Sequence, residues 1–372
     1  MCRARYIYHH NIITICLGVK LKLYISTDLG INSSGGTVVK HELDALKSID
    51  TVIEIGPEDT HPLWLGLPDI PFLIDYFTMK KLSAMDLSKV DLAHFYGGCY
   101  TETIKYLHSK GIKTTYAIMW HDRKISIEEH DKIHGAGSYP FIYVKDDKLF
   151  ELFSGGIREA DCVIAAGTAP RDLMLKEGAK RVEIVPIGCD IPERIEPFPD
   201  KFDVGYLGAV GPDKGLVYLI QAWDMLNYSD STLIFAGSQS HMVTQLINKY
   251  ATRGLYHIMG YVQHPRDLYN KCSVYVQPSA TEGFGLEVPE AMSYGRPVIV
   301  SDGAGACDCV TDGVDGFVVP KKDPKALADK IDWCRNHPKE LIEMGIRARE
   351  KSFQYSWDKT RQKYVELWRS LF

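Results

Sequence analysis

The chain has 372 residues, of which 45% are hydrophobic and 24% charged, and this composition excludes a wholly disordered protein. The formal net charge is −5, so the basic surplus of a nucleic-acid-binding protein is missing and no nucleic-acid partner is expected. The cysteines form no CxxC pair, which disfavours zinc ribbons and indicates a reducing, cytoplasmic compartment. No apolar run reaches the roughly 18 residues of a membrane helix.

Residues 1–19 are expected to be an extension that precedes the first folded domain. They begin with basic residues and contain a short apolar stretch, but no convincing small-residue cleavage site follows, so a secretory signal is not favoured. The first strand is predicted to begin near Lys20.

In the first half of the chain, short apolar runs alternate with amphipathic stretches, which is typical of βαβ units around a parallel sheet. Helices are predicted over residues 37–49 and 101–110, the second ending at Gly111. These elements predict a Rossmann-like domain over residues 20–195. The predicted strands are 20–27, 51–56, 91–97, 113–121, 161–167 and 181–188.

The second half repeats this scheme and predicts a second Rossmann-like domain over residues 200–354, after a proline-rich linker at 191–202. Asp323 and Pro324 predict the N-cap and first residue of a helix. The fold class is therefore α/β, with two doubly wound parallel sheets and a cleft at the carboxyl ends of the strands. The predicted strands are 202–207, 232–236, 257–262, 273–277, 298–301 and 317–319.

Residues 278–290 carry the most informative pattern, a strand end followed by a glycine loop and a helix start. Glycines allow a ligand to approach the backbone, so the amides of residues 284–286 (Phe284, Gly285 and Leu286) are candidates for diphosphate or sugar contacts. Glu282 could accept hydrogen bonds from sugar hydroxyls, and Glu290 from a ribose diol. The alternative is an ordinary turn with two solvated glutamates.

Two further glycine segments follow predicted strands. In residues 208–215 Lys214 could neutralise a phosphate, although a glycine turn with a surface lysine is the commoner case for such a segment taken alone. Gly35 and Gly36 open the first helix, where a ligand contact and a structural turn are equally favoured.

Histidines supply the remaining candidates. His121 ends a predicted strand and is expected to face the cleft and bind donor or acceptor hydroxyls, whereas His94 is expected to be structural. Neither a metal-binding histidine spacing nor a convincing DxD pair follows a strand, so we expect no metal and no resident cofactor.

Together these motifs resemble the retaining glycosyltransferases of family 4 (glycosyl transferases group 1), which have the GT-B fold. The strongest part is Glu282-Gly-Phe-Gly-Leu-Glu-Val-Pro-Glu290, followed by Gly-Arg-Pro-Val at 295–298. Residues 186–190 are similar to the family's Pro-Asn-Gly-Val-Asp, and residues 355–357 resemble the start of its last helix, which crosses back to the first domain, here 356–372.

The resemblance implies a nucleotide-diphosphate sugar donor, held mainly by the second domain. Lys214 would neutralise the diphosphate, Glu290 would hold the ribose, Glu282 and the backbone of residues 284–286 would position the sugar, and His121 would lie near sugar and acceptor. The family retains the anomeric configuration, transfers without a metal, and is usually drawn with front-face displacement.

One departure from the family pattern matters, because Ala209 stands where an arginine usually binds the diphosphate. Another cation, or the amides of Gly35 and Gly36, would have to substitute. Three alternatives stay open: a non-catalytic nucleotide-sugar-binding subunit, a glycoside hydrolase that uses Glu282 and Glu290, and a sugar-nucleotide epimerase.

The acceptor is expected to be a glycan, a lipid-linked sugar or a small molecule. In residues 68–81, the apolar Phe72, Leu73, Phe77 and Met79 beside Lys80 and Lys81 could contact the cytosolic membrane face; a core-packed helix is the commoner alternative.

Overall fold

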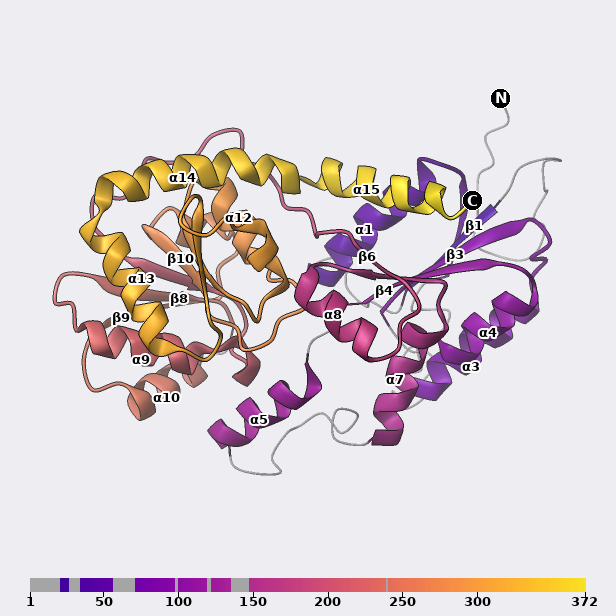
Figure 1. Ribbon diagram of the computed structural model, residues 1–372, viewed down its shortest axis with the longest axis horizontal. Coiled ribbons are helices and arrows are strands. Elements are labelled where there is room, and N and C mark those ends of the chain that lie inside the picture. Colours follow the sequence, from indigo (N-terminus) through magenta and orange to yellow (C-terminus); the bar gives the residue numbers. More distant parts are fainter. Residues whose placement is uncertain are drawn as a thin grey trace.

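The computed structural model describes residues 21–26, 34–55, 71–97, 100–118, 122–134, 147–238 and 240–372. Within these ranges the chain forms two six-stranded parallel sheets, each with helices packed on it, and so an α/β fold of two domains (Figure 1). The fold class predicted from the sequence is confirmed. None of the helices in these ranges is long and apolar enough to span a membrane.

The first sheet has the strand order β2-β1-β3-β4-β5-β6. Its strands are β1 (Leu21–Ser26), β2 (Thr51–Ile55), β3 (Val90–Tyr96), β4 (Lys113–Ala117), β5 (Cys162–Ala165) and β6 (Val182–Ile184). The helices of this half are α1 (Ser34–Lys47), α3 (Pro71–Ser83), α4 (Thr101–Ser109), α5 (Arg123–His134), α7 (Asp147–Glu159) and α8 (Thr168–Lys176). Phe77 and Met79 of α3 are partly buried, while the side chains of Phe72 and Leu73 lie outside the description.

β4 is shorter than the sequence predicts, because it ends at Ala117 rather than at residue 121. Its ladder with β3 ends at the pair of Tyr96 with Ala117, and its ladder with β5 ends at the pair of Ala117 with Ile164. The apolar run in the sequence continues beyond Ala117, and apolarity alone does not show where a ladder stops.

The second sheet has the order β12-β11-β10-β7-β8-β9. Read from the other edge, and numbered within this domain, the order is the 3-2-1-4-5-6 of dinucleotide-binding Rossmann domains. Its strands are β7 (Val204–Leu207), β8 (Thr232–Ala236), β9 (Leu255–Gly260), β10 (Val274–Gln277), β11 (Val298–Ser301) and β12 (Gly316–Val319). Its helical segments are η1 (Pro212–Lys214), α9 (Leu216–Leu226), α10 (Ser240–Tyr250), α11 (Arg266–Tyr269), α12 (Glu287–Ser293), η2 (Gly305–Cys309), α13 (Pro324–Asn336) and α14 (Pro338–Ser352).

Local sequence explains these elements. β7, β10 and β11 are buried throughout, as strands covered by helices on both faces must be, and their apolar runs made them predictable. The carboxylate of Asp323 accepts a hydrogen bond from the Ala326 amide at 2.9 Å, so the predicted N-cap of α13 is confirmed.

The last helix, α15 (Trp357–Ser370), leaves the second domain and packs on α1 of the first (Figure 1). Glu42 of α1 lies at the centre of this contact and accepts hydrogen bonds from the hydroxyls of Tyr24, at 2.8 Å, and Tyr364. The His94 Nε2 lies 3.2 Å from the same carboxylate, and the His94 side chain is completely buried. His94 is therefore a structural residue, as expected.

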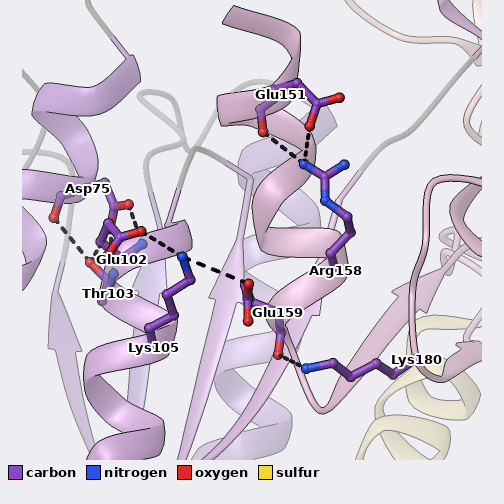
Figure 2. A network of polar contacts seen from close by, with 8 residues as sticks. All are labelled: Asp75, Glu102, Thr103, Lys105, Glu151, Arg158, Glu159 and Lys180. Carbon is purple, nitrogen blue, oxygen red and sulfur yellow. Dashed lines mark hydrogen bonds and ion pairs between the residues drawn. The ribbon is translucent and has the colours of Figure 1, made fainter. Parts of the chain in front are cut away.

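A second polar network ties together helices α3, α4 and α7 on one face of the first sheet (Figure 2). The Asp75 carboxylate accepts hydrogen bonds from the amides of Glu102 and Thr103 at 2.6 and 2.7 Å and so caps the start of α4. Lys105 lies 2.9 Å from Glu102 and 3.9 Å from Glu159 of α7. The buried cap stabilises this layer more than the exposed ion pairs do.

Candidate active site

The candidate site lies where the strand order of the second sheet reverses, between β7 and β10. The loops that follow these two strands meet at that point, because the carboxyl ends of neighbouring parallel strands share one edge of the sheet. The carbonyl of Asp213, in the loop after β7, accepts hydrogen bonds from the amides of Ala280 and Thr281, in the loop after β10, at 2.7 and 3.4 Å. The two motifs singled out in the sequence therefore form one surface.

Gly215 allows this close approach. Its φ is +70°, and a Cβ atom there would lie 1.9 Å from the carbonyl oxygen of Pro278. We call residues 208–215 the lysine loop and residues 278–286 the glutamate loop. A side chain at position 215 would push these two loops apart, so the glycine fixes how near they lie to each other.

Lys214 and Glu282 form an ion pair between these loops. The two side chains are 24% and 14% exposed, so the pair is partly shielded but open to solvent on one side. Burial alone would lower the pKa of Lys214, but the negative charges of Glu282, Glu287 and Asp213 outweigh burial and raise this pKa. The Lys214 ammonium group therefore stays positively charged at neutral pH.

Two further carboxylates come from α12. The Tyr269 hydroxyl donates a hydrogen bond to Glu290 Oε2 at 3.2 Å. Burial, assisted by the charge of Glu287, raises the pKa of Glu290 to about 8, so this carboxyl is largely protonated at neutral pH and can donate as well as accept hydrogen bonds. Burial also raises the pKa of Glu287, against the opposing effect of Lys214.

The raised pKa of Glu290 makes the stability of the fold depend on pH. The folded protein holds this proton up to about pH 8, whereas the unfolded chain loses it near the usual pKa of 4.5. The stability that the proton contributes is therefore present below pH 4.5 and is lost as the pH rises from 4.5 to about 8. We expect Glu290→Gln to stabilise the protein relative to wild type by roughly 2–4 kcal/mol more at pH 8.5 than at pH 4.5. Urea unfolding at both pH values measures this difference.

The matched control is Glu340→Gln, which removes an exposed carboxylate from the first turn of another helix, α14. Its stability is expected to follow that of wild type at both pH values. An unchanged pH dependence in Glu290→Gln would contradict the assignment of the raised pKa to Glu290.

The backbone of residues 284–286 lies between Glu282 and α12. The Phe284 ring is buried in the hydrophobic core, so only its backbone is available to a ligand at this point. Gly285 has a φ of +93°, which favours glycine, and Leu286 is partly buried. That these amides contact a diphosphate or sugar stays a prediction.

The sequence candidates of the first domain are Gly35, Gly36 and His121. Gly35 and Gly36 lie in the first turn of α1, which follows β1 at the reversal of strand order between β1 and β3. His121 lies outside the described residues. The residue after it, Asp122, donates its amide hydrogen to Thr281 Oγ1 at 2.9 Å, and so the chain that follows His121 contacts the residue before Glu282.

A second contact joins the two domains beside the glutamate loop. The amide of Thr168, at the start of α8, donates to the Asp308 carboxylate of η2 at 2.6 Å. From the sequence alone, no role was predicted for Thr281, Glu287 or Asp308. Glu287 carried a signal, as a third acidic residue within 282–290, whereas nothing in the sequence pointed to Thr281 or Asp308.

A metal site was not expected from the sequence. Among the residues that the structure describes, no three His, Cys, Asp or Glu side chains gather in a way that could hold a metal ion. The absence of a metal requirement stays a prediction.

Two α/β domains whose second sheet has Rossmann order, joined by a helix that crosses back, have the GT-B fold. The fold is found in sucrose-phosphate synthase from Thermosynechococcus elongatus, with a TM-score of 0.69 and 19% identity over 95% of this chain and 99% of that one. Anabaena HepE in complex with UDP-glucose has a TM-score of 0.67 and 18% identity over 94% and 99% of the two chains.

Residues 190–351, which include Lys214, Glu282 and Glu290, match the family described as glycosyl transferases group 1, in agreement with the resemblance seen in the sequence. The capsular polysaccharide biosynthesis glycosyltransferase CapM of Staphylococcus aureus is 30% identical over 175 residues, which are 44% of this chain and 46% of CapM. The D-inositol 3-phosphate glycosyltransferase of Corynebacterium urealyticum is 36% identical over 104 residues, 28% and 24% of the two chains. The chain thus spans less than half the length of these curated relatives.

Proposed function

We propose that this protein is a retaining glycosyltransferase that moves a hexose-type sugar from a nucleotide-diphosphate sugar to a hydroxyl of a glycan, lipid-linked or small-molecule acceptor, without a metal. The observation that carries this proposal is the Lys214–Glu282 ion pair at the strand reversal of the second sheet. A fixed positive charge at that place suits an anionic diphosphate leaving group.

The arrangement suggests how the site would act. The diphosphate would replace Glu282 as the ion-pair partner of Lys214. The Glu282 carboxylate would then be free to accept hydrogen bonds from the sugar. Glu290 would bind the ribose diol, and His121 would lie near the acceptor. The bond from the anomeric carbon to the phosphate oxygen breaks, the bond to the acceptor oxygen forms on the same face, and the acceptor proton passes to the departing phosphate. Positioning and electrostatic stabilisation of the diphosphate would supply most of the rate.

Related structures suggest the first donor to test. HepE was solved with UDP and with UDP-glucose, and Staphylococcus aureus TarM with UDP and alpha-GlcNAc-glycerol. A uridine diphosphate sugar is therefore the first candidate, ahead of guanosine and adenosine diphosphate sugars.

Position 209 favours a second candidate, a non-catalytic nucleotide-sugar-binding subunit. Ala209 is exposed and offers only its carbonyl, which accepts a hydrogen bond from the Tyr206 hydroxyl at 2.9 Å, so this point of the loop supplies no second cation. A hydrolase is less favoured, because Glu282 is held by a lysine rather than free to attack a sugar.

Ligand-dependent stability tests the proposal. We expect one nucleoside diphosphate among UDP, GDP, ADP, CDP and dTDP to stabilise the protein by about 2.7 kcal/mol at one hundred times its Kd, measured by thermal unfolding. Donors with the matching base are then offered to acceptors in the presence of EDTA, and the anomeric configuration of the product is determined by NMR.

The outcomes separate the candidates. Transfer with retention supports the proposal, and binding without transfer to any acceptor supports the subunit. Sugar release from a simple glycoside without nucleotide supports a hydrolase, and interconversion of the donor sugar without acceptor supports an epimerase. If none of the five nucleoside diphosphates binds, both the transferase and the subunit are contradicted.

A further inference from the structure

Helix α5 belongs to the first half of the chain but lies against the second domain (Figure 1). At its amino end, the amide of Asp122 donates to Thr281 Oγ1 at 2.9 Å. At its carboxyl end, Lys249 of α10 donates to the carbonyl of Ile133 at 3.1 Å. Both ends of the helix are therefore hydrogen-bonded to the second domain.

The middle of α5 contacts the second domain through Glu129. This carboxylate is buried and accepts hydrogen bonds from the Tyr218 hydroxyl of α9 at 2.7 Å and from Lys322 at 2.9 Å. Lys132 of α5 donates to the same Tyr218 hydroxyl at 2.8 Å, and Glu128 lies 3.4 Å from Lys322. A buried carboxylate costs free energy unless it is fully paired, and these partners come from the other domain.

Lys322 holds an unusual backbone conformation to make this contact. Its φ is +63°, in the left-handed region that a lysine rarely adopts. Such a conformation is unfavourable and persists only where other interactions hold it. The strained residue, in the turn before α13, is also the one that contacts Glu129 and Glu128 of the first half of the chain.

The contact adjoins the lysine loop. Tyr218 lies in the first turn of α9, three residues after Gly215, so Glu129 is attached to the helix that begins where the lysine loop ends. A cavity of about 110 Å³ is lined both by Ile133, at the carboxyl end of α5, and by Val210 and Pro212 of the same loop. Movement of α5 would therefore alter how the first domain covers the candidate site.

We propose that Glu129 is a positioning residue, which fastens α5 across the two domains through Lys322 and Tyr218 and so holds the crevice between them closed for transfer. The donor would be bound mainly by the second domain, so loss of the contact would slow transfer and leave nucleotide affinity nearly unchanged. The kinetic part rests on the proposed function, whereas the structural part does not.

The test uses the full chain and two variants. Lys322→Gly removes the ion pairs and also relieves the strained φ. If the contact served only to stabilise the fold, this variant would lose stability while the domains stayed closed. If the contact holds the crevice closed, the domains separate. Glu129→Gln keeps an oxygen for the Tyr218 hydroxyl and removes the charge. The matched control is Lys325→Met, which deletes a lysine whose ion-pair partner, Asp329, is on the same helix.

Small-angle X-ray scattering without ligand is expected to show a larger radius of gyration for both variants, and no change for Lys325→Met. The urea midpoint of Lys322→Gly is expected to be close to that of wild type, because glycine relieves the strained φ and the opened crevice hydrates Glu129. In transfer assays, kcat is expected to fall about tenfold while the Kd of the nucleoside diphosphate changes less than about twofold.

An unchanged radius of gyration in both variants would overturn the proposal, as would a lower urea midpoint of Lys322→Gly with the domains still closed. If no nucleoside diphosphate binds the wild-type protein, the proposed function fails, and the scattering result alone still decides the role of Glu129.

Discussion

Replacing Lys214 with alanine is expected to weaken binding of the nucleoside diphosphate and to reduce transfer by about ten- to hundredfold or more. A hydrogen bond between two charged groups contributes about 1.5–3 kcal/mol, which corresponds to that range. The loss should lie near the upper end, because Ala209 in the same loop offers no second charge to take over.

The charges that Lys214 leaves behind add to this effect. Glu282 loses its ion-pair partner, and the pKa of Glu287 rises further, because the charge of Lys214 no longer lowers it. The Glu282 carboxylate would then face an anionic ligand without a neighbouring cation, and Glu287 would add to the repulsion only at a pH high enough to ionise it. The affinity lost on substitution should therefore be smaller at pH 5.5, where Glu287 with its raised pKa is more fully protonated, than at pH 8.

Isothermal titration with the nucleoside diphosphate and steady-state kinetics measure both quantities. The control is Lys325→Ala, which removes an exposed lysine that is likewise paired to a carboxylate, that of Asp329. Unchanged affinity and turnover in Lys214→Ala would show that the diphosphate does not bind at this loop.

Replacing Gly215 with alanine is expected to destabilise the protein by about 2–5 kcal/mol. Two causes combine, since the positive φ disfavours any side chain and the added Cβ would overlap the carbonyl of Pro278 at 1.9 Å. The carbonyl belongs to backbone at the end of β10 and has little freedom to move. Urea unfolding measures the loss of stability, and the distorted loop should also bind nucleotide more weakly.

Gly313→Ala separates the two causes. Gly313 has nearly the same φ, +74°, but nothing lies within 4 Å of a Cβ atom there. Its cost should be only the backbone strain, about 1–2 kcal/mol. Equal destabilisation by both substitutions would show that the loops separate freely and that Gly215 does not fix their distance.

Much of the fold follows from local sequence. β8 and β11 have the predicted bounds, α13 begins after its predicted cap, and α14 restarts at Pro338. Apolar runs, caps and prolines act over a few residues, so each of these elements can be predicted from the sequence of its own segment. The predicted end of β4, at residue 121, was wrong. A strand ladder stops where its partner strands stop, and those partners are distant in the sequence.

The candidate site divides in the same way. The residue types at 214, 282 and 290 and their places after strands could be predicted, because a glycine loop after a parallel strand is a local pattern with a known position in the sheet. The ion pair between Lys214 and Glu282, which are 68 positions apart, could not, because it depends on β7 and β10 being neighbours in the sheet.

Thus the sequence by itself determined the two parallel-sheet domains, the order of their elements and the chemical groups offered at the strand ends. Only the tertiary structure decided which groups meet: Lys214 with Glu282, Thr281 with Asp122, and Glu129 with Lys322 of the other domain. The physical reason is range. Secondary structure responds to neighbours a few residues away, whereas contacts between distant segments depend on how all the layers pack together.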